Sequence, residues 1–356
     1  FKAVTRLYGV MRYALNGTPV LNYATDLWAQ LFFIGYTTVT SPMLWSRNYE
    51  SYIKDQELDK SIIRMTYNTE GINMPEKKII IVQDRLHGME RTYYDLLQEI
   101  SRRTYQSYKE GIVTHGSAFA FIAKQKLAAT SARASLNDEA FDALIKSIGK
   151  PSIKVDKEVS VGSKKRDDGS TMKEGKRSDL TSHKVKSESI EPEHELMSSD
   201  HIIVEYIKQR SDKDALIMWL KDSEGSAAKK STKFMTILDV LNNKIPVYEK
   251  VVIFSSYVRL LHLFAETLKD DSKHNDNKFV IVTGEMKNDE KDDAIDKFKN
   301  DNTVRIILLS MKVGEKGLNL QRANNLFFID PHWTIPEQPI DRVYRIGQKL
   351  SVKIFF

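Results

Sequence analysis

The chain contains no cysteine among its 356 residues. This absence excludes disulfide bonds and cysteine-based zinc sites, and it favours a reducing, intracellular compartment. No apolar run approaches the roughly 20 residues that a membrane-spanning helix needs, so we expect no membrane partner. The first ten residues, FKAVTRLYGV, have neither the layout of a signal peptide nor an initiator methionine. We therefore expect a piece of a longer intracellular protein.

What the chain does contain is enough apolar sequence for two globular domains. Hydrophobic residues make up 41% of it and charged residues 29%. The formal net charge is +6. A mild basic excess of this kind is compatible with a polyanionic partner, although many ordinary proteins share it.

Three zones differ in composition. Residues 1–148 are mixed and rich in aromatic side chains, and they include a strand pattern at 78–82 and a long helical pattern at 87–111. Residues 149–230 are predicted to be a charged linker, disordered or partly helical, because apolar residues are sparse up to about residue 195. Residues 231–356 alternate short apolar runs with helical patterns.

The alternation in the last zone predicts an α/β fold with a parallel sheet and right-handed crossovers. The expected strands are 251–254, 278–284, 304–310 and 325–330, and the expected helices are 258–268 and 288–300. Ligands of such sheets bind beyond the carboxyl ends of the strands. Small or polar residues stand at those ends, namely Ser255 and Ser256, Thr283 and Gly284, Ser310 to Gly317, and Asp330 to Trp333.

Near the C-terminus, the stretch QPIDRVYRIGQ (residues 338–348) places arginines at helical spacing. A helix is predicted to begin near Pro336 and Pro339, with a capping box from Thr334 to Glu337, and to stop at Gly347. On that helix, Gln338, Arg342 and Arg345 would share one face, and Ile340, Val343 and Ile346 would share an apolar face packed on the sheet.

Two planar, permanently charged guanidinium groups on one face suit an anion with several oxygens, above all a triphosphate. The alternative is that both arginines pair with surface carboxylates, such as Asp341 four residues before Arg345. The flanking sequence favours the first interpretation.

That flanking sequence resembles a known family. LLSMKVGEKGLNLQRANNLFFIDPHW and EQPIDRVYRIGQ resemble motifs V and VI of the Swi/Snf-type branch of the superfamily-two helicases, which are double-stranded-DNA translocases. RYALNGTPVLNYATDLWAQLFFI (residues 12–34) resembles motif III of the same branch, and VVIFSSY resembles motif IV. The ending RIGQ differs from the DEAD-box RNA helicases, which usually continue with GR, so an RNA helicase is disfavoured.

The resemblance implies a RecA-like second lobe at 231–356 and, at 1–148, the end of a RecA-like first lobe with a helical insertion. It implies ATP and Mg²⁺ as cofactors, with Arg342 and Arg345 as catalytic arginine fingers. Gln338, Gly314, Gly317, Gly17 and Thr18 would contact or couple to the nucleotide. Ser255, Ser256, Ser310 and Lys312 would contact DNA phosphates.

The sequence also departs from the family pattern. It contains no G-x-x-x-x-G-K-[ST] phosphate loop and no acidic box before motif III. We expect both, and with them the magnesium ligands, to lie upstream of Phe1, so that this fragment alone does not hydrolyse ATP. No metal site is expected within the chain itself.

The resemblance thus predicts an ATP-dependent, chromatin-remodelling or DNA-repair type of helicase-like ATPase that works on double-stranded DNA, in the nucleus or wherever a virus or bacterium handles DNA. Nucleosomes or chromatin proteins are further candidate partners. The alternative is a catalytically inactive DNA- or chromatin-binding scaffold that keeps the fold. Retention of both Arg342 and Arg345 argues against such decay.

Overall fold

The computed structural model describes residues 9–15, 24–36, 41–53, 73–150, 192–222, 231–271, 278–314, 318–331 and 336–356. The chain forms two compact units, residues 1–74 and 75–356. In the first unit, α1 (Ala24–Ile34) packs on α2 (Pro42–Ile53) around a small core. Trp28 and Trp45 are buried in this core with Leu27 and Leu31.

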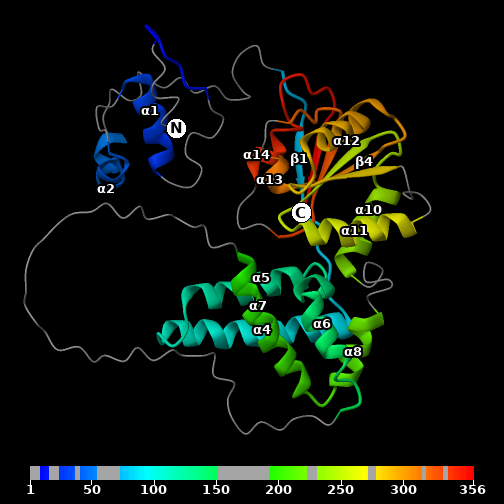
Figure 1. Ribbon diagram of the computed structural model, residues 1–356. Helices are drawn as coiled ribbons and strands as arrows, with labels where there is room; N and C mark the ends of the chain where they lie inside the picture. Colours follow the sequence, from blue (N-terminus) through cyan, green and yellow to red (C-terminus); the bar gives the residue numbers. More distant parts are fainter. Residues whose placement is uncertain are drawn as a thin grey trace, which may run out of the picture. The chain divides into compact units, whose positions relative to one another are not determined.

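The second unit is built on a six-stranded sheet in which all neighbouring strands are parallel. Its order is β1-β6-β5-β2-β4-β3. Figure 1 labels β1 and β4 in this sheet. The strands are β1 (Lys77–Ile80), β2 (Lys250–Ser255), β3 (Phe279–Val282), β4 (Ile306–Ser310), β5 (Ala323–Phe328) and β6 (Val352–Phe355). β2, β4 and β5 are buried throughout, which explains why their apolar runs are continuous. The predicted α/β fold with a parallel, RecA-like sheet is confirmed.

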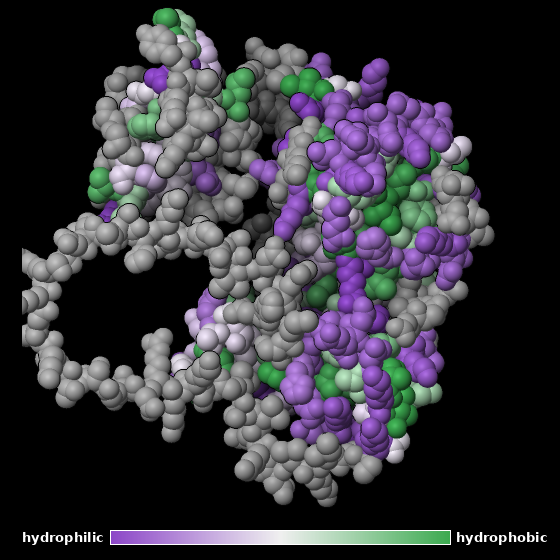
Figure 2. Space-filling model, in the orientation of Figure 1, coloured by the Kyte–Doolittle hydropathy of each residue, from purple (hydrophilic) through white to green (hydrophobic). Residues whose placement is uncertain are grey.

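Helices and short helical turns pack around this sheet. They are α10 (Thr232–Asn243), α11 (Val258–Asp270), α12 (Asn288–Asn300), α13 (Met311–Gly314) and α14 (Glu337–Ile340). α12 has the bounds expected from its pattern, and it buries Ile295 and Phe298 while its outer face is charged. Figure 2 shows this hydrophilic surface over α12. The amphipathic pattern of the sequence therefore predicted both the bounds of α12 and the face that it buries.

A helical bundle forms the other part of the second unit, below the sheet in Figure 1. It contains α4 (Gly88–Lys109), α5 (His115–Ala128), the 3-10 helix η2 (Ala132–Ser135), α6 (Asp138–Ile145), α7 (Pro192–Lys208) and α8 (Lys213–Asp222). Its core joins Leu97 of α4, Phe121 of α5, Phe141 of α6, Ile203 of α7 and Leu216 of α8. Among the described helices, none is long and apolar enough to cross a membrane.

These compact units differ from the divisions expected at residues 1–148, 149–230 and 231–356. β1 does not join the first unit but extends the sheet of the last zone, by pairing with β6. α7 and α8 lie within the expected linker, yet they pack in the bundle core. Residues 151–191, on which the prediction of disorder rests, lie outside the described residues.

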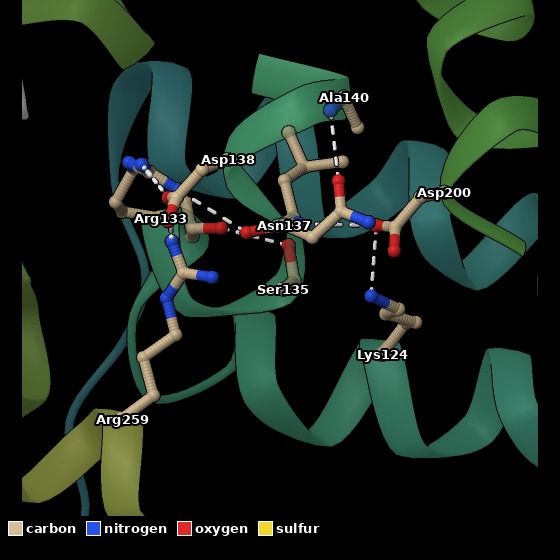
Figure 3. Close-up of polar contacts among 10 residues, drawn as sticks. Lys124, Arg133, Ser135, Asn137, Asp138, Ala140, Asp200 and Arg259 are labelled. Atoms are coloured by element: carbon tan, nitrogen blue, oxygen red, sulfur yellow. Dashed lines mark hydrogen bonds and ion pairs between the residues drawn. The ribbon is translucent and has the colours of Figure 1, made fainter. Parts of the chain in front are cut away.

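Polar contacts fasten the bundle to the sheet part. The carboxylate of Asp138 accepts hydrogen bonds from Arg133 (2.6 Å) and from Arg259 of α11 (2.8 Å), as Figure 3 shows. The buried carboxylate of Glu90 accepts from the backbone N–H of Thr232 at the start of α10 (3.2 Å). A carboxylate at a helix N-terminus is favourable because it satisfies N–H groups that have no partner within the helix.

Candidate functional site

The arginine turn, residues 337–348, is the segment on which the predicted function depends. α14 covers only Glu337–Ile340, so the helix predicted to continue to residue 346 is wrong. In a helix, the carbonyls of Arg342 and Val343 would accept from residues four positions further on. Here the carbonyl of Arg342 accepts from the N–H of Leu320 (2.9 Å), and that of Val343 accepts from the side-chain amide of Gln348 (3.2 Å). Tertiary hydrogen bonds have replaced the helical ones.

The apolar residues of this turn follow the prediction in part. Ile340 and Val343 are buried, as expected. Ile346 was expected on the same apolar face, but its side chain is 66% exposed. Gly347 has φ +101°, a conformation that residues other than glycine rarely adopt. The prediction that Gly347 stops the helix is wrong, because α14 already ends at Ile340. Thr334, the predicted cap, lies outside the described residues.

The two arginines occupy different environments. Arg342 is half-buried, and its Nε donates to the carbonyl of Gly314 in α13 (3.2 Å). Arg345 lies in the turn beyond α14 and is exposed. The predicted single helical face shared by Gln338, Arg342 and Arg345 is therefore wrong, since the helix ends before either arginine. What the structure does bring together is Arg342 and the segment resembling motif V.

Gly314 is required by packing. A Cβ at this position would lie 2.6 Å from the ring of Phe254, closer than real Cβ atoms approach a neighbour. The glycine therefore lets α13 lie against β2 while its carbonyl binds Arg342. This finding explains why a glycine stands here without invoking a nucleotide. The other predicted residues of this class, Gly317, Gly17 and Thr18, lie outside the described residues.

The predicted DNA-contacting residues fall into two groups. Ser256 and Lys312 are exposed at the carboxyl ends of β2 and β4, where a phosphate could reach them. Ser255 is fully buried, and its hydroxyl donates to the carbonyl of Tyr257 and accepts from the N–H of the same residue. The predicted phosphate contact of Ser255 is therefore not supported. Ser310 is also buried, and its hydroxyl has no hydrogen-bond partner among the described residues.

Asp330 joins two of these strand ends. It follows β5, is 1% exposed, and accepts a hydrogen bond from the backbone N–H of Ser256 (2.9 Å). Asp330 also interacts electrostatically with Lys233, which lies in the first turn of α10. Burial lowers the pKa of Lys233 to about 8, and the negative charge of Asp330 opposes that shift. Lys233 borders a pocket of about 790 Å³ that also contacts Phe328.

Gln348 is a residue whose role the sequence did not predict. Its side-chain Nε2 lies within hydrogen-bond distance of the carbonyls of Gln321 (3.1 Å) and Ala323 (2.9 Å), in addition to Val343. Its Oε1 accepts from the N–H groups of the next two residues. The side chain is 7% exposed and fixes the arginine turn to the start of β5. Its partners Gln321 and Ala323 are distant in sequence, so no local pattern predicts these contacts. The ending RIGQ was the one sequence feature that pointed to this residue.

Metal ligands are not gathered in this part of the molecule. Across the residues that the structure describes, no group of three or more His, Cys, Asp or Glu side chains is arranged to hold a metal ion.

Comparison with known proteins shows which domain family this part of the chain is similar to. Residues 232–348, from the first residue of α10 to Gln348, match the helicase conserved C-terminal domain. The matched region ends at the residue that anchors the arginine turn, and it includes both arginines and the strand ends described above.

Two individual proteins and one solved structure are also similar to this chain. A putative helicase of Invertebrate iridescent virus 6 is 27% identical over 99% of this chain and 54% of its own length. The DNA repair protein RAD5A of Arabidopsis thaliana is 31% identical over 35% of this chain and 12% of its own length. The SWI2/SNF2 ATPase core domain of Sulfolobus solfataricus aligns with a TM-score of 0.45 and 21% identity, over 99% of this chain and 57% of that chain.

The resemblance to the Swi/Snf-type helicases is confirmed. The chain spans about half the length of the viral relative and about a tenth of RAD5A.

Proposed function

We propose that this chain belongs to an ATP-driven translocase that moves along double-stranded DNA. The observation that supports this most directly is the hydrogen bond from Arg342 to the carbonyl of Gly314. It joins the arginine turn to α13, the turn that follows the carboxyl end of β4. In parallel sheets, ligands bind at that edge.

The arginine turn fits a nucleotide by the chemistry of its donors. Guanidinium groups are planar and always charged, and they match phosphate oxygens in geometry. Arg345 is exposed and would contact the terminal phosphate, while Arg342 is held by Gly314 and would orient the turn. ATP, when bound, supplies the phosphoanhydride bond that is cleaved. Arg345 would then stabilise the charge that develops on the transferred phosphoryl group.

Contacts with DNA would come from the exposed strand ends. Lys312 after β4 and Ser256 after β2 are exposed at the same edge of the sheet. Cations and small polar groups at such positions bind phosphates and do not read base sequence. Binding should therefore be independent of sequence and steeply dependent on salt.

The test is ATP turnover by the full-length protein with duplex DNA, single-stranded DNA or RNA as the stimulating polymer. We expect duplex DNA to stimulate turnover most, and affinity for DNA to fall steeply with salt. No ATP turnover with any of the three polymers, together with retained DNA binding, would replace the translocase by a catalytically inactive scaffold. Stimulation by RNA alone would make the protein an RNA helicase.

A further inference from the structure

Tyr344 stands between the two arginines and binds a distant part of the chain. Its side chain is buried, and its hydroxyl donates to the carbonyl of Pro75 (2.9 Å). The ammonium group of Lys77 lies 5.2 Å from the centroid of its ring, within the range of a cation–π interaction. Tyr344 therefore contacts the chain immediately before β1 and at its first residue.

The segment that Tyr344 binds is also fixed to the sheet. The carbonyl of Glu76 accepts from the N–H of Val352 (2.9 Å), where β6 begins. The crossing segment, residues 73–76, contains the boundary between the two compact units, since the first ends at Met74 and the second begins at Pro75. The chain thus enters the second unit at the residue whose carbonyl Tyr344 binds.

The arginine turn is consequently held from two directions. On one side, the backbone carbonyl of Arg342 accepts from Leu320 and its side chain donates to Gly314. On the other side, Tyr344 is tied to Pro75. Arg345 is the next residue after Tyr344, so the place of its backbone depends on the tyrosine.

We propose that Tyr344 is a positioning residue that ties the arginine turn to the crossing segment. A displacement of the crossing segment is then transmitted to Arg345 through the hydroxyl of Tyr344. This proposal rests on the proposed ATP-driven function, because only that function gives the position of Arg345 a catalytic consequence. Tyr344 itself touches no phosphate in this account.

The experiment uses Tyr344→Phe in the full-length protein, with Tyr93→Phe as the matched control. Tyr93 is also a buried tyrosine with a hydrogen-bonded hydroxyl, here to Ser135 (2.7 Å), but it lies in the bundle. Each variant loses one hydroxyl and keeps its ring. We expect Tyr344→Phe to lower the kcat of DNA-stimulated ATP turnover by about 10-fold with KM for ATP nearly unchanged, because misplacement of a catalytic group slows the chemical step. Tyr93→Phe should keep the kcat of the natural protein.

A second measurement does not depend on activity. Amide hydrogen exchange within residues 341–346 should become faster in Tyr344→Phe and remain unchanged in Tyr93→Phe. If the natural protein is active and the two variants have the same kcat, or if exchange in the turn is unaltered, the positioning role is overturned. If the natural protein shows no DNA-stimulated turnover, the proposed function fails, and faster exchange would then show only a structural tie.

Discussion

Arg305 in the sheet part and Lys124 in the helical bundle of the second unit are both buried cations, but their hydrogen-bond partners differ in kind. In the sheet part, the guanidinium group of Arg305 donates to the backbone carbonyls of Leu241, Ile245, Pro246 and Glu249. In the bundle, Lys124 donates to the carboxylate of Asp200 (2.8 Å). A carbonyl cannot be titrated or removed by mutation, whereas a carboxylate can.

The difference follows from what each cation does. Arg305 and Lys250 close the ends of helices and loops, where carbonyls lack helical partners, and Lys250 binds the carbonyls of Asp301 (2.7 Å) and Val304 (2.8 Å). Lys124 instead joins α5 to α7, two helices that are far apart in the sequence. The contact of Lys124 should therefore be sensitive to a change at Asp200, whereas no side-chain change removes the carbonyl partners of Arg305 and Lys250.

The largest effect is expected from breaking the bundle's buried ion pair. Both side chains are about 5% exposed. Burial raises the pKa of Asp200 and lowers that of Lys124, and the partner opposes each shift. Lys124→Met should lower the free energy of unfolding by about 4 kcal/mol, because it leaves a buried charge without its partner.

The control for that prediction is a double variant. Lys124→Met with Asp200→Asn removes both charges and keeps an acceptor for the N–H of Asn137, so most of the loss should be recovered. Denaturant unfolding measures both variants. A double variant no more stable than Lys124→Met would show that the cost does not come from an unpaired charge.

The second effect belongs to the sheet part. Arg305→Met should lower the free energy of unfolding by about 3 kcal/mol, because it leaves several carbonyls without their hydrogen-bond donor. Arg322→Met, at an exposed arginine of the same lobe, should change it by less than about 0.5 kcal/mol. Equal unfolding midpoints for the two variants would contradict the comparison.

The third effect is a pH dependence that favours alkaline solution. The pKa of Lys233 is about 8 when folded, below its ordinary value of 10.5, because burial disfavours the charged form. Between these values the unfolded chain holds a proton that the folded chain has lost, so the contribution of Lys233 to stability rises with pH. Lys233→Met should raise stability at pH 7 by at most roughly 3 kcal/mol, the value of the whole pKa difference, and remove this rise. Unfolding curves from pH 7 to 10 would show whether it does.

The smallest effect concerns Asp138, the carboxylate between Arg133 and Arg259. The hydrogen bond from Arg133 is the main cause that lowers the pKa of Asp138 below 3.8, with Arg259 adding to it. Its contribution to stability is therefore present above about pH 4 and is lost as pH falls through the lower, folded pKa. Because its side chain is 79% exposed, Asp138→Asn should weaken stability only slightly at pH 7 and reduce the acid dependence. Unfolding curves measured between pH 5 and pH 2 test this prediction. If the free energy of unfolding of Asp138→Asn falls with acid as steeply as that of the natural protein, the prediction is refuted.

Much of the sheet could be predicted from the sequence because its central strands are buried on both faces. The runs at 251–254 and 304–310 coincide closely with β2 and β4. β6 was not predicted, and neither was the sheet to which β1 belongs. β1 lies at one edge of the sheet and β6 lies beside it, and the place of β1 depends on pairing between Lys77 and Val352, two positions that no local pattern relates.

The candidate site shows the same limit. The residues of the arginine turn could be predicted from their spacing and family resemblance, but their geometry could not. Local pattern favoured a helix through Arg345, whereas Leu320 and Gln348 bind the carbonyls that such a helix would have used. The burial of Ser255 was likewise hidden, because a strand end gives no sign of whether its side chain faces the core.

The most direct test of the central claim is DNA-stimulated ATP turnover by the full-length protein carrying Arg345→Ala. Arg322→Ala is the matched control, because both arginines are exposed and neither change should unfold the protein. We predict that Arg345→Ala lowers kcat by about 10³-fold or more, as removal of an arginine that stabilises phosphoryl transfer does, while Arg322→Ala leaves it within about 2-fold. Equal turnover by the two variants would contradict the assignment of the arginine turn to nucleotide phosphate.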